Sequence, residues 1–124
     1  MSLLLDTHVV LWWLADDATL ADDVKSRLDV EPDVYVSSAT IWEIAIKQAI
    51  GKISQPADLP DLVRSSGFRE MRISFEHAIT AGRLPLLHRD PFDRMLVAQA
   101  KCENLTLVTR DAHCQKYEVD VLVV

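Results

Sequence analysis

The sequence predicts one α/β domain in which helices cover a mainly parallel sheet. Short runs of consecutive apolar residues alternate along the chain with longer segments of helical periodicity. Runs of this kind suit strands that are buried on both faces of a parallel sheet. The 124 residues, of which 49% are hydrophobic, provide one core and leave no room for a second. We therefore expect a single domain over residues 1–124.

Three apolar runs are the clearest strand candidates, at residues 3–5, 34–36 and 105–108. Each is short, bounded by polar residues and rich in leucine or valine. Residues 71–73 and 119–124 are weaker candidates, and we expect the last of them to form an edge of the sheet.

Helical patterns fill the segments between these runs. They cover residues 7–14, 18–28, 40–50, 60–65, 75–83 and 91–103. Gly51 follows the third pattern, where a left-handed residue commonly ends a helix. Pro60 and Pro91 suit the first turn of the helices that they open. The alternation of strands and helices implies right-handed crossovers and an α/β sandwich.

Four carboxylates fall where these elements begin or end. Asp6 directly follows the first strand, and Asp111 follows the strand at 105–108. Glu43 and Asp93 lie near the starts of two helices. Because ligand sites in open parallel sheets form beyond the carboxyl ends of the strands, we expect the four side chains to gather at one edge.

Each acid also has an ordinary structural interpretation. Asp6 could cap the helix that begins at residue 7. Glu43 precedes Lys47 by one helical turn, a spacing that favours a surface ion pair. Asp93 would complement the positive end of its helix, and Asp111 could be a turn residue. The functional interpretation therefore rests on the joint placement of the four acids.

Clustered carboxylates repel one another and need a cation to hold them together. Mg²⁺ and Mn²⁺ prefer such oxygen ligands, whereas the sequence shows no His and Cys set with the spacing typical of zinc. One or two of these ions could generate a hydroxide nucleophile and stabilise charge on a phosphoryl group. The sequence thus predicts metal-assisted in-line displacement at a phosphoryl group.

The charge of the chain argues against one class of nucleic-acid binder. At a net charge of −6, a broad basic surface for sequence-independent phosphate contacts is not expected. A bound cation would instead supply positive charge locally. No stretch approaches the roughly 20 apolar residues of a membrane span, so we expect a cytoplasmic protein with no membrane partner. We expect Cys102 and Cys114 to be free thiols.

Four segments of the chain resemble the PIN domain of VapC-type toxins, the ribonuclease half of bacterial toxin–antitoxin pairs. In chain order they are LLLDTHVVLWWL, SSATIWEIAIK, HRDPFDRMLVAQA and LVTRDAH, and the third is the most specific. The resemblance spans nearly the whole chain. It implies a PIN-like three-layer α/β/α sandwich and a metal-dependent endoribonuclease that acts as the toxin of such a pair.

The resemblance also implies roles for single residues. The family's metal-binding acids fall on Asp6, Glu43 and Asp93, and its fourth acid falls on Asp111. Of these, Asp6 and Asp93 would be the strongest direct ligands of Mg²⁺ or Mn²⁺. Thr109 matches the small hydroxyl residue that often accompanies the fourth acid.

The partners implied by the resemblance are RNA, a second copy of the chain and a small antitoxin. The antitoxin's tail would occupy the groove of the active site and insert a basic side chain among the acids. The adjacent Trp12 and Trp13 diverge by about 100° around a helix, so we expect at least one of them at an interface.

Basic residues and histidines supply further candidates. Phosphate contacts could come from Lys47, Arg89, Arg94 and Arg110. Of these, Arg94 is the strongest candidate because it directly follows Asp93. His8 and His88 are candidate proton carriers, although a hydroxide generated on a metal needs no histidine base.

Three other functions remain open at this point. A PIN-like fold could be retained as an inactive protein- or RNA-binding module. An aspartyl-phosphate phosphatase or a receiver domain also places an aspartate after a first parallel strand, but the phosphatase pattern requires a second aspartate where this chain has His8. A deoxyribonuclease would use the same phosphodiester chemistry.

Overall fold

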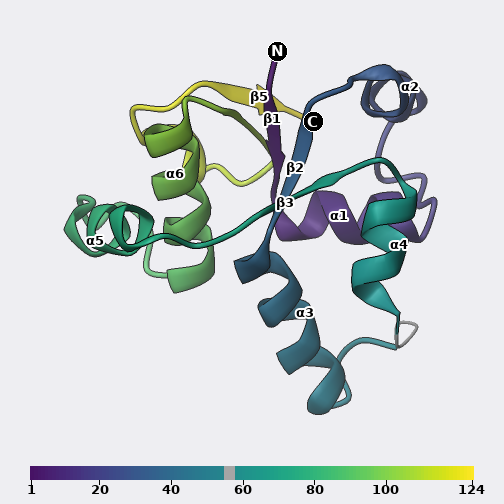
Figure 1. Cartoon of the computed structure of the whole chain (residues 1–124), viewed down its shortest axis with the longest axis horizontal. Helices are drawn as coiled ribbons and strands as arrows, with labels where there is room; N and C mark the ends of the chain where they lie inside the picture. Colours follow the sequence, from purple (N-terminus) through teal and green to yellow (C-terminus); the bar gives the residue numbers. More distant parts are fainter. Residues whose placement is uncertain (55–57) are drawn as a thin grey trace.

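The computed structural model describes residues 1–54 and 58–124, and over these residues it shows a five-stranded sheet between helices (Figure 1). The strands are β1 (Leu3–Leu5), β2 (Val34–Ser37), β3 (Arg69–Met71), β4 (Thr106–Thr109) and β5 (Val121–Val123). Their order is β3-β2-β1-β4-β5, and every neighbouring pair is parallel. The predicted parallel sheet is therefore confirmed, with β5 at an edge.

The helices form two layers, one on each face of the sheet. They are α1 (Thr7–Leu14), α2 (Asp22–Val30), α3 (Ser38–Ala49), α4 (Leu59–Ser65), α5 (Phe75–Arg83) and α6 (Pro91–Glu103). Buried residues of α1, α2, α3 and α4 share one core cluster, whereas those of α6 belong to a second. In Figure 1, α5 and α6 lie together on one side of the strands, and α1, α2 and α4 lie on the other. The α/β/α sandwich is thus confirmed.

The central strand β1 shows why its sequence is apolar at consecutive positions. Leu3 and Leu5 belong to the first core cluster, and Leu4 belongs to the second. All three side chains are completely buried. Burial of each leucine side chain contributes roughly 1.5–3 kcal/mol, so this short strand anchors both layers.

The structure corrects the expected boundaries of two elements. Strand β3 covers Arg69–Met71 instead of residues 71–73, and α2 begins at Asp22 instead of residue 18. An edge strand has one neighbour, so β3 carries exposed charged side chains and lacks an apolar run. Before α2, the Asp17 carboxylate accepts the Thr19 N–H at 2.8 Å, which holds that segment in a turn.

Two helix ends explain how the chain turns back toward the sheet. Gly51 follows α3 with φ +74°, as the sequence predicts. Asn104 ends α6 in the left-handed region with φ 54°, and its N–H bonds to the Ala100 carbonyl. Within residues 1–54 and 58–124, no helix is both long enough and apolar enough to span a bilayer.

Candidate active site

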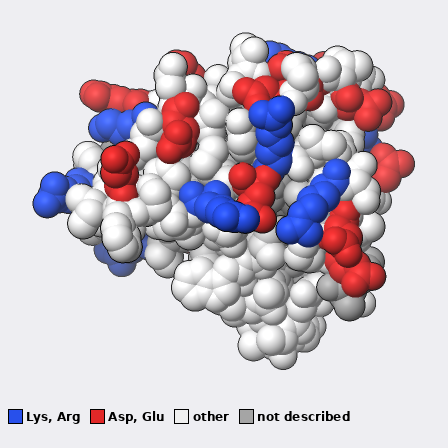
Figure 2. All heavy atoms as spheres, in the orientation of Figure 1, with Lys and Arg blue, Asp and Glu red and all other residues white. Residues whose placement is uncertain are grey.

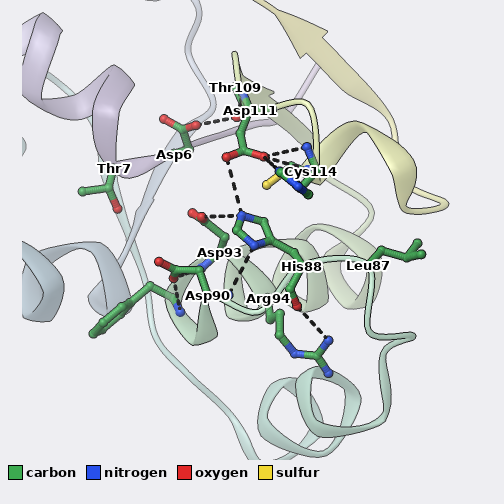
Figure 3. A network of polar contacts seen from close by, with 12 residues as sticks. Asp6, Thr7, Leu87, His88, Asp90, Asp93, Arg94, Thr109, Asp111 and Cys114 are labelled. Carbon is green, nitrogen blue, oxygen red and sulfur yellow. Dashed lines mark hydrogen bonds and ion pairs between the residues drawn. The ribbon is translucent and has the colours of Figure 1, made fainter.

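Segments far apart in the sequence bring acidic side chains together at the carboxyl ends of β1 and β4 (Figure 3). Asp6 follows β1, and its N–H bonds to the Val108 carbonyl of β4 at 3.0 Å. Asp111 lies two residues beyond β4. Asp93 lies in the first turn of α6. Because the helix of a parallel crossover runs against its strands, the start of α6 reaches the same edge of the sheet.

Asp6 combines a structural and an electrostatic role. Its Oδ1 accepts the Val9 N–H at 2.9 Å and so caps α1, while its Oδ2 accepts the Thr109 hydroxyl. The side chain is almost fully buried. Burial raises the pKa of Asp6, although the hydrogen bonds from Thr109 and Val9 oppose this effect. The capping interpretation and the site interpretation therefore both describe Asp6.

The surroundings of Asp93 favour its protonated, neutral form over the carboxylate. Burial raises the pKa of Asp93 to about 7, and the neighbouring charges of Asp90, Asp111 and Asp6 contribute to this rise. Asp90 is the N-cap of α6, since its Oδ1 accepts the N–H groups of Phe92 at 2.9 Å and Asp93 at 3.1 Å. Asp90 therefore caps the helix whose first turn carries Asp93.

Asp111 is more exposed than the other two aspartates, and its carboxylate accepts two backbone hydrogen bonds. Its Oδ1 accepts the backbone N–H of His113 at 2.7 Å and that of Cys114 at 3.1 Å. Burial raises its pKa, but these hydrogen bonds and the nearby imidazoles together hold the pKa of Asp111 below its ordinary value. Its own N–H bonds to Thr109 Oγ1 at 3.0 Å, so Thr109 connects Asp111 with Asp6.

Glu43 joins this group through Thr7. The Thr7 hydroxyl donates to Glu43 Oε1 at 2.7 Å, and Thr7 is the chain neighbour of Asp6. The Glu43 side chain is buried, and its Oε2 lies 3.2 Å from Lys47 Nζ. The ion pair expected from the sequence is therefore present, and the Thr7 hydroxyl links Glu43 to the residue that follows Asp6.

Arg94 does not face the acids. Its guanidinium donates to the carbonyls of Ala81 at 2.8 Å, Leu84 at 3.1 Å and Pro85 at 3.1 Å. Figure 3 shows the side chain directed away from Asp93. This placement does not support the expected phosphate contact, because the donors already bind the α5–α6 connection.

The structure places His88 closer to the acids than sequence reasoning suggested. Its Nε2 lies 2.9 Å from Asp93 Oδ2 and 3.5 Å from Asp111 Oδ2. The signal in the sequence was the HRD tripeptide that precedes α6, but only the fold reveals that Asp111 lies beside it. His8, the other candidate proton carrier, is exposed on the first turn of α1.

The fold also gathers His and Cys donors that are distant in the sequence. Ligand atoms of His88, Asp93 and Cys114 lie within 4.8 Å of one another, as do those of His88, Asp111 and His113. The spacing in the sequence did not reveal these mixed donor groups, which the fold assembles. Burial and the nearby carboxylates, Asp93 first, raise the pKa of the Cys114 thiol, which opposes formation of a thiolate ligand.

The carboxylates fit a hard divalent cation on the chemistry of their donor set. Asp6, Asp93 and Asp111 offer oxygen ligands, and burial together with the charges of Asp90, Asp111 and Asp6 raises the cost of charging Asp93. A cation in their midst would relieve that cost, since it favours the ionised form of each ligand. Mg²⁺ and Mn²⁺ are the metals that this oxygen-rich group suits best.

The parallel α/β/α architecture and the carboxylates at one end of its sheet define an α/β protein with a candidate divalent-cation site. A family comparison identifies the chain further. The profile of the family described as "PIN domain" matches residues 3–119, so the chain belongs to the PIN domain family. This membership confirms the resemblance seen in the sequence.

Relatives and solved structures agree with this assignment. The chain is 29% identical over 124 residues to "Ribonuclease VapC22" of Mycobacterium tuberculosis (strain ATCC 25618 / H37Rv), covering 94% of this chain and 92% of that protein. It is similar in fold to the crystal structure of VapBC2 from Rickettsia felis bound to a promoter DNA fragment (TM-score 0.75, 16% identity, 99% and 98% of the two chains covered). It is also similar to FitAcB from Neisseria gonorrhoeae (TM-score 0.68, 21% identity, 97% and 96% covered).

Proposed function

We propose that this chain is a metal-dependent endoribonuclease that acts as the toxin of a toxin–antitoxin pair. The observation that carries the reaction class is the meeting of Asp6, Asp93 and Asp111. Burial, followed by the charges of Asp90, Asp111 and Asp6, raises the pKa of Asp93 to about 7. Membership of the PIN domain family and similarity to a protein named as a ribonuclease support RNA as the substrate. The similarity in fold to the VapBC2 and FitAcB structures supports an antitoxin partner.

The acidic side chains and Thr109 would have different roles in the site. Asp6 and Asp93 would hold a divalent cation directly, and Asp111 and Glu43 would complete its surroundings. Bound Mg²⁺ or Mn²⁺ supplies Lewis acidity toward phosphate oxygens and lowers the pKa of water. Thr109 keeps Asp6 and Asp111 in place through hydrogen bonds to both residues.

A second copy of the chain is the partner that best fits an exposed stripe on α3. The stripe consists of Trp42, Ala45, Ile46, Ala49 and Ile50, which recur on one helical face and are all exposed. Figure 2 shows this lower part of the molecule without Lys, Arg, Asp or Glu. Because the chain carries a net charge of −6, pairing through an uncharged face avoids repulsion between like copies.

Trp12 and Trp13, of which at least one was expected at an interface, are partly exposed and both make contacts within the chain. The Arg110 guanidinium covers the Trp12 ring, with 4.7 Å between Arg110 Cζ and the centroid of the ring. Trp13 donates from Nε1 to Ser66 Oγ at 3.0 Å and packs against Phe68. Trp42 is 61% exposed and is therefore the tryptophan that we assign to the homodimer.

The oligomeric state tests this assignment. We expect wild-type protein to elute as a dimer in size-exclusion chromatography with light scattering, and Ile46→Asp to elute as a monomer. Ile79→Asp, an exposed isoleucine on α5, is the matched control and should remain dimeric. A wild-type monomer at high concentration, or a dimeric Ile46→Asp, would contradict the α3 interface.

Cleavage of nucleic acid tests the proposed activity. End-labelled RNAs and single-stranded DNA would be incubated with antitoxin-free protein in Mg²⁺, Mn²⁺ or chelator. We expect metal-dependent cleavage of RNA that is lost in Asp6→Ala and Asp93→Asn. Cleavage of DNA alone would identify a deoxyribonuclease. Metal binding without cleavage of any substrate would instead favour an inactive binding module.

A further inference from the structure

Of the two His88 ring nitrogens, Nδ1 has a hydrogen-bond partner at the start of α6, whereas Nε2 is buried without one among the described residues. Its Nδ1 accepts the backbone N–H of Asp90 at 3.2 Å. A ring nitrogen that accepts from an amide carries a lone pair, so the proton of the imidazole lies on Nε2. The backbone of the α6 N-terminus thus decides which nitrogen of His88 is the donor.

The donor nitrogen faces two of the site's carboxylates. Nε2 lies 2.9 Å from Asp93 Oδ2 and 3.5 Å from Asp111 Oδ2, and the side chain is only 14% exposed. These aspartates come from different elements, α6 and the loop after β4. In Figure 3 the His88 ring lies below Asp111 and beside Asp93, and dashed lines join its Nε2 to both carboxylates.

The position of the ring is fixed by the surrounding chain. The His88 N–H donates to the Tyr117 hydroxyl at 2.9 Å, and that hydroxyl in turn donates to the Pro85 carbonyl at 2.7 Å. On the other side, the His113 ring packs against His88 with 5.0 Å between the centroids. These contacts place the Nε2–H bond independently of the two aspartates that it faces.

We propose that His88 is a positioning residue whose Nε2–H, placed beside the carboxylates of Asp93 and Asp111, holds them together by electrostatic attraction. This inference rests on the proposed function. Two like charges brought close together repel, and a donor placed beside both oxygens offsets that repulsion. The pair is thereby arranged before the cation arrives, and His88 raises the affinity for metal without being a ligand.

Two other roles for His88 fit the geometry less well. To bind a metal through Nε2, the ring would have to carry its proton on Nδ1. Two donors, Nδ1–H and the Asp90 N–H, would then face each other. As a proton carrier to RNA, Nε2 would have to reach the substrate, but this atom is enclosed and faces the aspartates. Its orientation suits the support of ligands, a role that typically changes metal affinity 10- to 100-fold.

The test compares His88→Ala with His88→Gln, because a glutamine amide can present an N–H close to the position of Nε2. Titration calorimetry with Mn²⁺ measures affinity without requiring cleavage. We expect His88→Ala to weaken Mn²⁺ binding by about 10-fold or more, and His88→Gln to stay within about threefold of wild type. Saturating Mn²⁺ should restore most of kcat for RNA cleavage in His88→Ala, since His88 does not contact substrate.

Several results would overturn the inference. Unchanged Mn²⁺ affinity in His88→Ala would show that His88 does not support the ligands. An equal loss in His88→Gln, or an equal loss in His88→Ala and His113→Ala, would make the histidines metal ligands. Wild-type protein that binds Mn²⁺ but cleaves no RNA would contradict the proposed function alone, whereas wild-type protein that binds no Mn²⁺ would contradict both.

Discussion

The hydroxyl of Thr109 donates a hydrogen bond to the carboxylate of Asp6, although 103 positions separate the two residues in the sequence. Strands β1 and β4 are neighbours in the sheet, and both residues lie at their carboxyl ends. The same hydroxyl accepts the Asp111 N–H at 3.0 Å. One buried side chain therefore fixes the distance between two acids of the candidate site.

Replacing Thr109 by valine should impair the site while preserving its shape. Valine removes the hydroxyl but keeps the branched volume, so the pKa of Asp6 should rise further because an opposing hydrogen bond is lost. We expect the free energy of unfolding, measured in urea, to fall by about 1 kcal/mol. Cleavage should require about 10-fold more Mg²⁺ than in the wild type. Thr109→Ser retains the hydroxyl and should behave like wild type. Equal activity of the valine and serine variants would show that the hydrogen bond is dispensable.

Asp93→Asn should stabilise the metal-free protein and abolish its activity. The pKa of Asp93 is raised from 3.8 to about 7 in the folded chain, so ionisation opposes folding. Stability contributed by the protonated carboxyl is present below about pH 4 and is lost as pH rises toward and through 7. The variant escapes this loss. In chelator at pH 8 we expect a gain on the order of 2 kcal/mol, or several degrees in Tm.

A comparison of wild-type and Asp93→Asn protein at pH 5 and pH 8 tests whether ionisation of Asp93 destabilises the fold. The advantage of Asp93→Asn in thermal unfolding should be larger at pH 8, where the wild-type carboxylate is ionised. Asp90→Asn serves as the comparison for Asp93→Asn, because the carboxylate of Asp90, unlike that of Asp93, caps α6. A lower Tm for Asp93→Asn at pH 8 in chelator would contradict the electrostatic account.

Added divalent metal should reverse the order of stability of these proteins. A ligand that binds only the folded state stabilises it by RT ln(1 + [L]/Kd), which is about 2.7 kcal/mol at 100 times Kd. We therefore expect millimolar Mg²⁺ or Mn²⁺ to raise the Tm of the wild type and to leave Asp93→Asn nearly unchanged. The measurement is thermal unfolding against metal concentration, with Ca²⁺ as a test of size preference. No shift in the wild type would count against a metal site.

The sequence predicts the parts of this protein that follow from local patterns and sheet topology. Asp6 and Asp93 could be placed together because a buried strand ends at Leu5 and a helix begins at Pro91. The contact of His88 with Asp111 could not be predicted, because it depends on how the loop after β4 returns over α6. The same limit applies to β3, whose exposed Arg69 and Glu70 give no strand signal.

Arg94→Ala should lower stability strongly and affect RNA binding little. The guanidinium donates to the carbonyls of Ala81, Leu84 and Pro85, which connect α5 with α6. Removing it leaves these acceptors without their donor, so we expect a loss on the order of 3 kcal/mol in denaturant unfolding. Arg94→Lys should recover only part of this stability, because an ammonium cannot reproduce the planar fork of donors. Under conditions where Arg94→Lys is folded, its KM for RNA should match that of the wild type. Unchanged stability with a raised KM would instead return Arg94 to the phosphate-binding role that its place beside Asp93 suggested.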